Sequence, residues 1–131
     1  MERKNRKMKA FTLIEIMVVV LIVGLLAGLV GINVVRYFER ARERTAKTQI
    51  SMIEQALELY KMEQGRYPTT DEGVGSLVKG GYLKGKEIPK DPWGSEYYYV
   101  SDGKTFTLKS AGPDKSIGTQ DDISTESQVA Q

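Results

Sequence analysis

The sequence predicts an α+β fold in which one long N-terminal helix packs, through its second half, on a small antiparallel sheet. A short helix and a C-terminal acidic loop complete the expected chain. Three patterns lead to this prediction: an uncharged apolar run, apolar residues at helical spacing after it, and two short β-like segments around an Asp-Gly turn. The globular part must be small, because the first third of the chain is too apolar for a water-soluble core.

The apolar run covers 20 residues, from Ile16 to Val35, without a charge. At about 1.5 Å per residue, a helix of this length spans roughly 30 Å, the thickness of a bilayer core. A secretory signal peptide has a shorter apolar stretch, of about 7–15 residues, which ends in a small-residue cleavage site. Here the run continues into Arg36 without such a site. We therefore expect a retained transmembrane helix.

The charges differ between the two ends of the chain. The net charge is +2, but residues 1–10 carry five Lys or Arg and one Glu, which leaves 14 basic and 16 acidic side chains after them. A basic cluster before a spanning helix is held on the cytoplasmic side of the membrane. The basic excess therefore indicates orientation and gives no reason to expect nucleic-acid binding.

The chain contains no Cys and no His. It therefore has no disulfide or thiolate metal site, and it lacks the commonest catalytic base and transition-metal ligand. The segment 73–77, Gly-Val-Gly-Ser-Leu, does not match the G-x-S-x-G nucleophile elbow. The sequence thus predicts that the protein is not an enzyme.

Glu15 is a carboxylate at the start of the apolar stretch. Burying an unpaired charge there costs at least about 2.5 kcal/mol, so a partner is expected. The simpler interpretation places Glu15 at the membrane interface, in the first turn of the helix, where its charge suits the helix dipole. That interpretation explains why the carboxylate is tolerated without explaining the residues around it.

After Val35 the pattern becomes amphipathic, with Ile50, Ile53, Leu57 and Tyr60 at helical spacing. No Pro or Gly lies between Asn33 and Gln64, and Gly65 supplies a C-terminal stop. We expect one helix from about Thr12 to Gln64, whose apolar stripe covers the globular part. The stripe is interpreted as core, not as a ligand site.

The remaining segments predict a short helix and a hairpin. Thr69 and Glu72 have the spacing of a capping box, and a short helix is expected to follow and to stop at Gly80-Gly81. The segments 97–100 and 105–108 are separated by Ser-Asp-Gly-Lys, which predicts two antiparallel strands joined by a turn.

The segment 110–122 contains three Asp in a loop with Gly and Pro. Calcium takes 6–8 oxygen ligands, which carboxylates, carbonyls and hydroxyls of such a loop can supply. The spacing is not that of an EF-hand. From the chemistry alone, solvated acids in a turn are the favoured interpretation.

The residues Lys-Ala-Phe-Thr-Leu-Ile-Glu at 9–15 resemble the processing site of type IV pilins and type II secretion pseudopilins. The resemblance implies that a prepilin peptidase cuts between Ala10 and Phe11 and methylates the new amino terminus. It also implies that Glu15, the fifth mature residue, meets the amino terminus of a neighbouring subunit during assembly. Ala10 departs from the Gly that usually precedes the cut.

Further segments narrow the resemblance to the major pseudopilins of type II secretion. These are "RYPTT.EG" at 66–73, "DPWG..Y" at 91–97, and "SAGPD" followed by "DDI" at 110–114 and 121–123. The resemblance runs from about Ala10 to Ile123 and implies a pilin-like fold. It also implies an inner-membrane, single-pass precursor with its head in the periplasm, which polymerises into a periplasmic pseudopilus that drives export of folded proteins. The implied partners are other copies of the chain, minor pseudopilins, the prepilin peptidase and the inner-membrane assembly platform.

The same resemblance implies a structural calcium ion in the acidic loop, 111–122. The matching ligands are Asp114, Asp121 and Asp122, with the Ala111 carbonyl and an oxygen between Ser116 and Thr119, for which we take Thr119, as weaker candidates. Lys115 stands where a Gly is common in the family. The ion would order a loop that has little apolar content.

The expected organisation is a cytoplasmic leader at 1–10, a transmembrane and assembly helix at 11–35, its amphipathic continuation at 36–64 and a globular head at 65–131. Two alternatives stay open: a pilin of a type IV pilus or DNA-uptake system, and an exported calcium-dependent binding domain with an ordinary signal or anchor.

Overall fold

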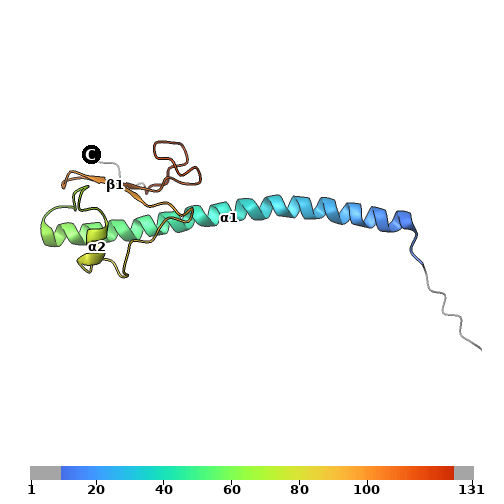
Figure 1. The fold of residues 1–131 in the computed structure, drawn as a ribbon, viewed down its shortest axis with the longest axis horizontal. Coiled ribbons are helices and arrows are strands. Elements are labelled where there is room, and N and C mark those ends of the chain that lie inside the picture. Colours follow the sequence, from blue (N-terminus) through green and yellow to red (C-terminus); the bar gives the residue numbers. More distant parts are fainter. Residues whose placement is uncertain (1–9, 126–131) are drawn as a thin grey trace, which may run out of the picture. The chain divides into compact units, whose positions relative to one another are not determined.

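The computed structural model describes residues 10–125, and the chain divides into two compact units, the first ending at Phe38 and the second beginning at Glu39. Helix α1 (Leu13–Gln64) belongs to both, and helix α2 (Gly75–Lys79) and strands β1 (Tyr98–Ser101) and β2 (Phe106–Lys109) belong to the second unit (Figure 1). The predicted α+β fold and the bounds of the long helix are confirmed to within a residue at the N-terminal end.

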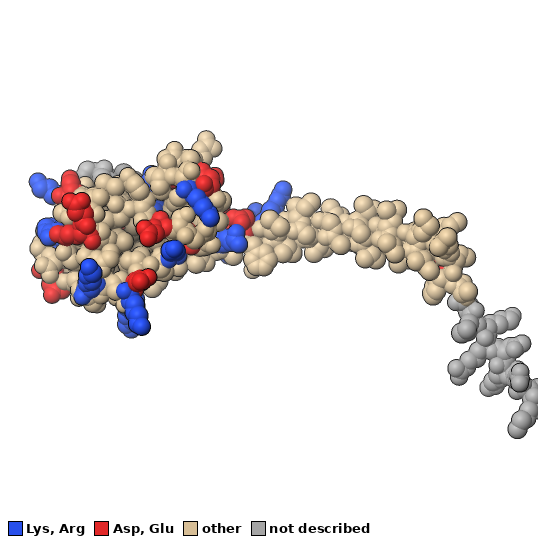
Figure 2. All heavy atoms as spheres, in the orientation of Figure 1, with Lys and Arg blue, Asp and Glu red and all other residues tan. Residues whose placement is uncertain are grey.

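The first unit contains the apolar half of α1. Thr12 precedes the helix, and its Oγ1 accepts a hydrogen bond from the Glu15 backbone N–H at 3.3 Å, the arrangement of an N-cap. The large apolar side chains from Phe11 to Val35 are exposed, and this part of α1 is long and apolar enough to cross a membrane. In Figure 2 this surface is almost wholly uncharged, whereas Lys, Arg, Asp and Glu gather on the second unit.

The second unit is built on the predicted stripe of α1. Ile50, Ile53 and Leu57 are at most 1% exposed, whereas Tyr60 is half-buried and packs edge-on against Tyr82. Ala46 and Ala56 extend the stripe, and the other core residues are Tyr67, Leu77, Tyr97, Tyr99, Leu108 and Ile123. Residues of α2, of both strands and of the end of the acidic loop therefore pack in one core with the apolar face of α1.

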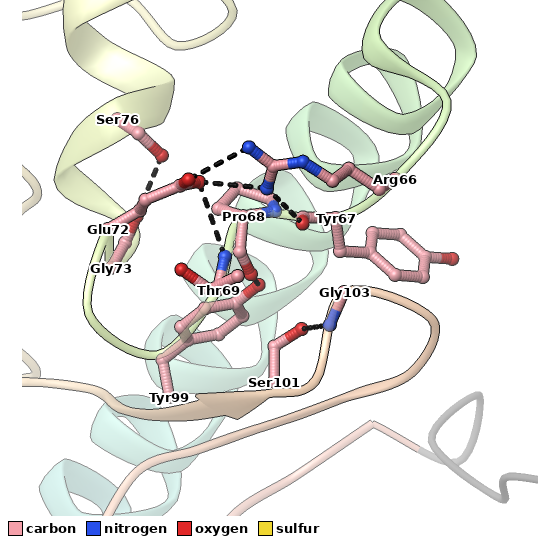
Figure 3. Close-up of polar contacts among 10 residues, drawn as sticks. All are labelled: Arg66, Tyr67, Pro68, Thr69, Glu72, Gly73, Ser76, Tyr99, Ser101 and Gly103. Carbon is pink, nitrogen blue, oxygen red and sulfur yellow. Dashed lines mark hydrogen bonds and ion pairs between the residues drawn. The ribbon is translucent and has the colours of Figure 1, made fainter.

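The chain leaves α1 at Gly65, which has a φ of 81°. The loop that follows, residues 66–73, is closed by an ion pair between Arg66 and Glu72, and we call this loop the clasp (Figure 3). The Arg66 guanidinium donates to both carboxylate oxygens of Glu72, at 2.8 and 3.1 Å. Its hydrogen bonds hold the pKa of the Glu72 carboxyl below its usual value. This ion pair closes the loop between α1 and α2.

Helix α2 confirms the predicted short helix but corrects its start. The Glu72 carboxylate accepts the Thr69 backbone N–H at 3.3 Å, which is half of the expected capping box. The helix begins later, at Gly75, and its N-cap is Val74, without a side-chain cap. The capping box is therefore half present, but it belongs to the turn before α2, and the predicted helix start at Thr69 was wrong.

The hairpin is present with strands shifted by one residue from the prediction. Ser101 pairs with Phe106, so Asp102 to Thr105 form the turn. The Asp102 carboxylate accepts the backbone N–H groups of Thr105 and Lys104, at 2.8 and 2.9 Å, and these bonds lower its pKa. Asp102 therefore fixes the turn as a side-chain acceptor, and Gly103 supplies a φ of 92°.

Strand β1 is fastened to the clasp by polar contacts. The Tyr99 hydroxyl donates to the Pro68 carbonyl at 2.6 Å (Figure 3). The Thr70 hydroxyl donates to the Ser101 carbonyl at 3.0 Å. Tyr67 donates to Glu58 of α1 at 2.6 Å, and burial together with this bond raises the pKa of Tyr67 to about 12. Helix, clasp and hairpin are thus joined into one unit.

The core role of α1 is tested by two leucines two positions apart. Leu57 is fully buried and Leu59 is 52% exposed. We expect Leu57→Ala to lower the free energy of unfolding by about 2–5 kcal/mol, because it leaves a cavity under the sheet. Leu59→Ala removes the same atoms from an exposed side chain and should change the free energy of unfolding by less than about 0.5 kcal/mol.

Urea unfolding of the full chain in detergent, followed by circular dichroism, measures both variants. Equal losses for the two leucines would contradict the assignment of the core face.

Candidate functional site

The candidate site of the second unit begins at the Asp-Pro-Trp-Gly turn, where Asp91 is 4% exposed. Its Oδ1 accepts the backbone N–H groups of Trp93 and Ser95, at 3.2 and 2.7 Å. Its Oδ2 accepts the Ser110 hydroxyl at 2.7 Å. One buried carboxylate therefore forms the turn and binds it to the end of β2.

Ser110 links the Asp91 turn to the acidic loop. Its backbone pairs with Ile123 in an isolated antiparallel bridge, with N–H···O distances of 2.8 and 2.9 Å. Its Oγ accepts the Gly112 N–H at 3.2 Å. The bridge closes the loop, and the Asp91 carboxylate holds the residue at its base.

The two ends of the acidic loop approach closely. A Cβ at Gly112, where φ is 74°, would lie 2.2 Å from the Asp121 carbonyl oxygen. Only glycine fits there, because any side chain would overlap this backbone. The approach brings Asp121 beside the segment that follows Ala111, which is itself buried.

The three predicted carboxylates have different surroundings. Asp114 Oδ1 accepts the Ser116 N–H at 2.9 Å, and Asp121 is exposed. Asp122 Oδ2 accepts the Gly118 N–H at 2.8 Å and lies 3.1 Å from Lys109 Nζ. The Gly118 N–H and the Lys109 ammonium lower the pKa of Asp122.

The weaker ligand candidates also lie in the loop. The Thr119 hydroxyl donates to the Ser116 carbonyl at 3.1 Å. Across residues 10–125, no three acidic side chains are grouped closely enough to hold a metal ion by themselves. A cation in this loop would therefore depend on backbone carbonyls and hydroxyls as well.

Lys115 has a φ of 57°, in the left-handed region. This conformation costs a residue other than glycine about 1–2 kcal/mol. The loop therefore has a glycine-like turn at Lys115.

The turn around Asp91 also contacts α1. Trp93 Nε1 donates to Glu39 Oε2 at 3.3 Å, and Arg42 donates to Glu39 Oε1 at 3.0 Å. Tyr97, three residues after the turn, hydrogen-bonds through its hydroxyl to Gln49 of α1. These contacts fix the turn on the part of α1 that belongs to the second unit.

The predicted processing and assembly residues lie in the first unit. Ala10 and Phe11 precede α1 and are exposed, and Glu15 lies in its first turn, also exposed. The structure thus confirms the first-turn position, where the helix dipole favours a carboxylate. The cut between Ala10 and Phe11 and the contact of Glu15 with a neighbour stay predictions.

The sequence interpretation missed Asp91, Ser110 and Thr12. Thr12-x-x-Glu15 has the capping-box spacing and could have been recognised. Asp91 and Ser110 are 19 positions apart, and no local pattern relates them.

Asp91 is expected to be required for stability of the second unit. Asp91→Ala removes the acceptor of Trp93, Ser95 and Ser110 at a buried position, and we expect it to lower the free energy of unfolding by about 3 kcal/mol or more. Asp71→Ala, an exposed control, should change it by less than about 0.5 kcal/mol. Urea titration of both full-length variants measures this, and comparable effects would contradict the role of Asp91.

Comparison with known proteins gives two family matches. The profile of the type II secretion system protein G family matches residues 33–126, and the prokaryotic N-terminal methylation motif matches residues 5–31. Together they cover both units.

Individual relatives agree with these matches. The type II secretion system core protein G of Escherichia coli K12 is 42% identical, with 92% of both chains covered. That of Vibrio cholerae is 41% identical, with 92% of this chain and 93% of the relative covered. The protein of the same name from Pseudomonas aeruginosa is 40% identical, with 90% and 92% covered.

A solved structure is also similar. The crystal structure of the major pseudopilin from the type 2 secretion system of enterohaemorrhagic E. coli superposes with a TM-score of 0.59 and 28% identity, covering 66% of this chain and 84% of the other. From sequence profile, relatives and fold together, this chain belongs to the type II secretion system protein G family.

Proposed function

We propose that this chain is a major pseudopilin, a structural subunit that polymerises into the periplasmic pseudopilus of a type II secretion system and so drives export of folded proteins. The observation that carries the proposal is the match of residues 33–126 to the protein G family, joined to an exposed apolar helix with a methylation motif. The role is structural, not catalytic.

The apolar half of α1 supports storage in a membrane before assembly. Its large side chains are exposed within one chain, so they need lipid or other copies around them. The basic leader at 1–10 favours a cytoplasmic N-terminus, and the second unit would then lie in the periplasm. The precursor is thus a single-pass inner-membrane protein.

Assembly would use the amino terminus created by cleavage before Phe11. Phe11 and Glu15 are four residues apart, and Phe11 lies two residues before the start of α1. If the helix extended to the new terminus, this spacing would place the two residues one turn apart on the same face. An ammonium and a carboxylate would then lie near the same end of every subunit, available to neighbouring copies. Contacts between unlike surfaces build an open helical filament.

The partners follow from this role. The prepilin peptidase would process the chain, minor pseudopilins would join the filament, and an inner-membrane assembly platform would add subunits. The runner-up, a pilin of a type IV pilus or DNA-uptake system, shares the methylation motif but does not account for the match over 33–126.

Processing is tested by the mass and N-terminal sequence of protein extracted from membranes. We expect loss of residues 1–10 and a methylated Phe11. Glu15→Gln should still be processed but should fail to form filaments, because it lacks the charge that pairs with a neighbour's terminus.

An exposed charge elsewhere gives the control, and Glu87→Gln should be processed and assembled normally. An intact leader, or a cut near Gly31, would overturn the assembly proposal and favour an ordinary anchor or signal.

We also propose that the acidic loop holds a structural calcium ion. The donors are oxygens only, which suits a hard cation. Asp114, Asp121 and Asp122 would hold it, together with the Ala111 carbonyl and Thr119. When bound, the ion would supply positive charge that holds the carboxylates of the loop together.

The close approach of Gly112 and Asp121 supports this proposal, because it brings the two ends of the loop together. The bridge between Ser110 and Ile123 fixes the base of the same loop. The loop itself is exposed from Pro113 to Asp121 and contributes little to the core.

Calcium is tested by thermal unfolding of the full chain in detergent with calcium or with chelator. We expect chelation to lower the melting temperature, because a ligand that binds only the folded state stabilises it. Asp121→Ala should abolish the difference, whereas Asp71→Ala should retain it. A wild-type melt that does not change with chelation would remove the calcium proposal.

A further inference from the structure

Lys109 is the last residue of β2, and its ammonium lies against the acidic loop. Nζ is 3.1 Å from Asp122 Oδ2, and the two side chains are 24% and 13% exposed. The same ammonium lies over the Tyr98 ring, 5.6 Å from its centroid. The Lys109 ammonium therefore already contacts one oxygen of Asp122, which is a proposed calcium ligand.

The partly buried position makes this pair different from an ordinary surface ion pair. Water and salt screen exposed charges strongly, and they screen covered ones less. Asp122 Oδ2 also accepts the Gly118 N–H at 2.8 Å. The same oxygen therefore joins two parts of the loop to each other and, through Lys109, joins the loop to β2. Lys109 thus fastens the loop to the sheet.

A metal ion could bind Asp122 through Oδ1, which lies 3.5 Å from the Thr119 hydroxyl, but it would then share one carboxylate with the lysine on Oδ2. An ammonium and a divalent cation repel when both lie against one carboxylate. Within the described residues, Lys109 is the lysine that pairs with a carboxylate of the loop, whereas Lys104 and Lys115 are exposed. The competition therefore concerns this one side chain.

We infer that Lys109 is a built-in cation of the acidic loop that competes with calcium for Asp122. When calcium is scarce, the lysine holds the loop against β2, and when calcium binds, Asp122 is released from the lysine. Lys109 therefore sets the calcium concentration at which the loop takes up the ion. This inference rests on the proposed calcium site.

The test compares Lys109→Met and Lys109→Arg with the wild type as full chains in detergent. Lys104→Met is the matched control, because it removes the same charge from the exposed hairpin turn. Calorimetric titration with calcium chloride gives the dissociation constant, and thermal unfolding in chelator gives the stability of the metal-free loop.

We expect Lys109→Met to bind calcium roughly two- to fivefold more tightly, the range given by ion-pair strengths. In chelator, its melting temperature should fall by a few degrees. Lys109→Arg keeps the positive charge and should resemble the wild type in both measurements, as should Lys104→Met. Lys109→Gln, which keeps a polar end, should repeat the tighter binding if the Met variant does not fold in chelator.

The outcomes separate the two proposals. If the wild type binds calcium and Lys109→Met and Lys109→Gln bind it no more tightly, the competition is wrong and the calcium site stands. If neither the wild type nor the variants bind, the calcium proposal fails and the competition fails with it. Binding by the variants alone would mean that the lysine excludes the ion in the wild type, which supports the inference.

Discussion

The second unit depends on the burial of one face of α1, formed by Ile50, Ile53 and Leu57. A two-stranded hairpin is at best marginally stable by itself. Leu108 and Tyr99 from the strands and Leu77 from α2 meet that face in a single core cluster. Packing on α1 limits where α2 and the two strands can lie. The hydrogen bonds of the clasp and of the Asp-Pro-Trp-Gly turn then fix these elements in place.

Sequence periodicity predicted this part of the fold because it depends on residues three and four apart. The hairpin was also predictable, since Asp-Gly at 102–103 acts locally. The capping box was only half right: Glu72 binds the Thr69 N–H and also Arg66, six positions away, and the helix begins later, at Gly75. Asp91 and Ser110 lay beyond prediction, because their bond joins a turn to the end of a strand 19 positions away.

The acidic loop, too, was predictable only in its local features. Its carboxylates are evident in the sequence, and their environments are set by Gly112, Ser110 and Lys109, which lie at its base. The left-handed Lys115 shows that the loop keeps its turn at some conformational cost. Composition predicts only the kind of ligand, a hard cation, and the tertiary structure shows which oxygens of the loop already have protein partners.

Trp93 is the single tryptophan of the chain, and its two N–H groups serve different parts of the second unit. The backbone N–H bonds Asp91, which leads through Ser110 to the acidic loop, and the indole N–H bonds Glu39 of α1. The protein thus carries an intrinsic fluorophore between the loop and the helix. Its emission should report loosening at either end without a label.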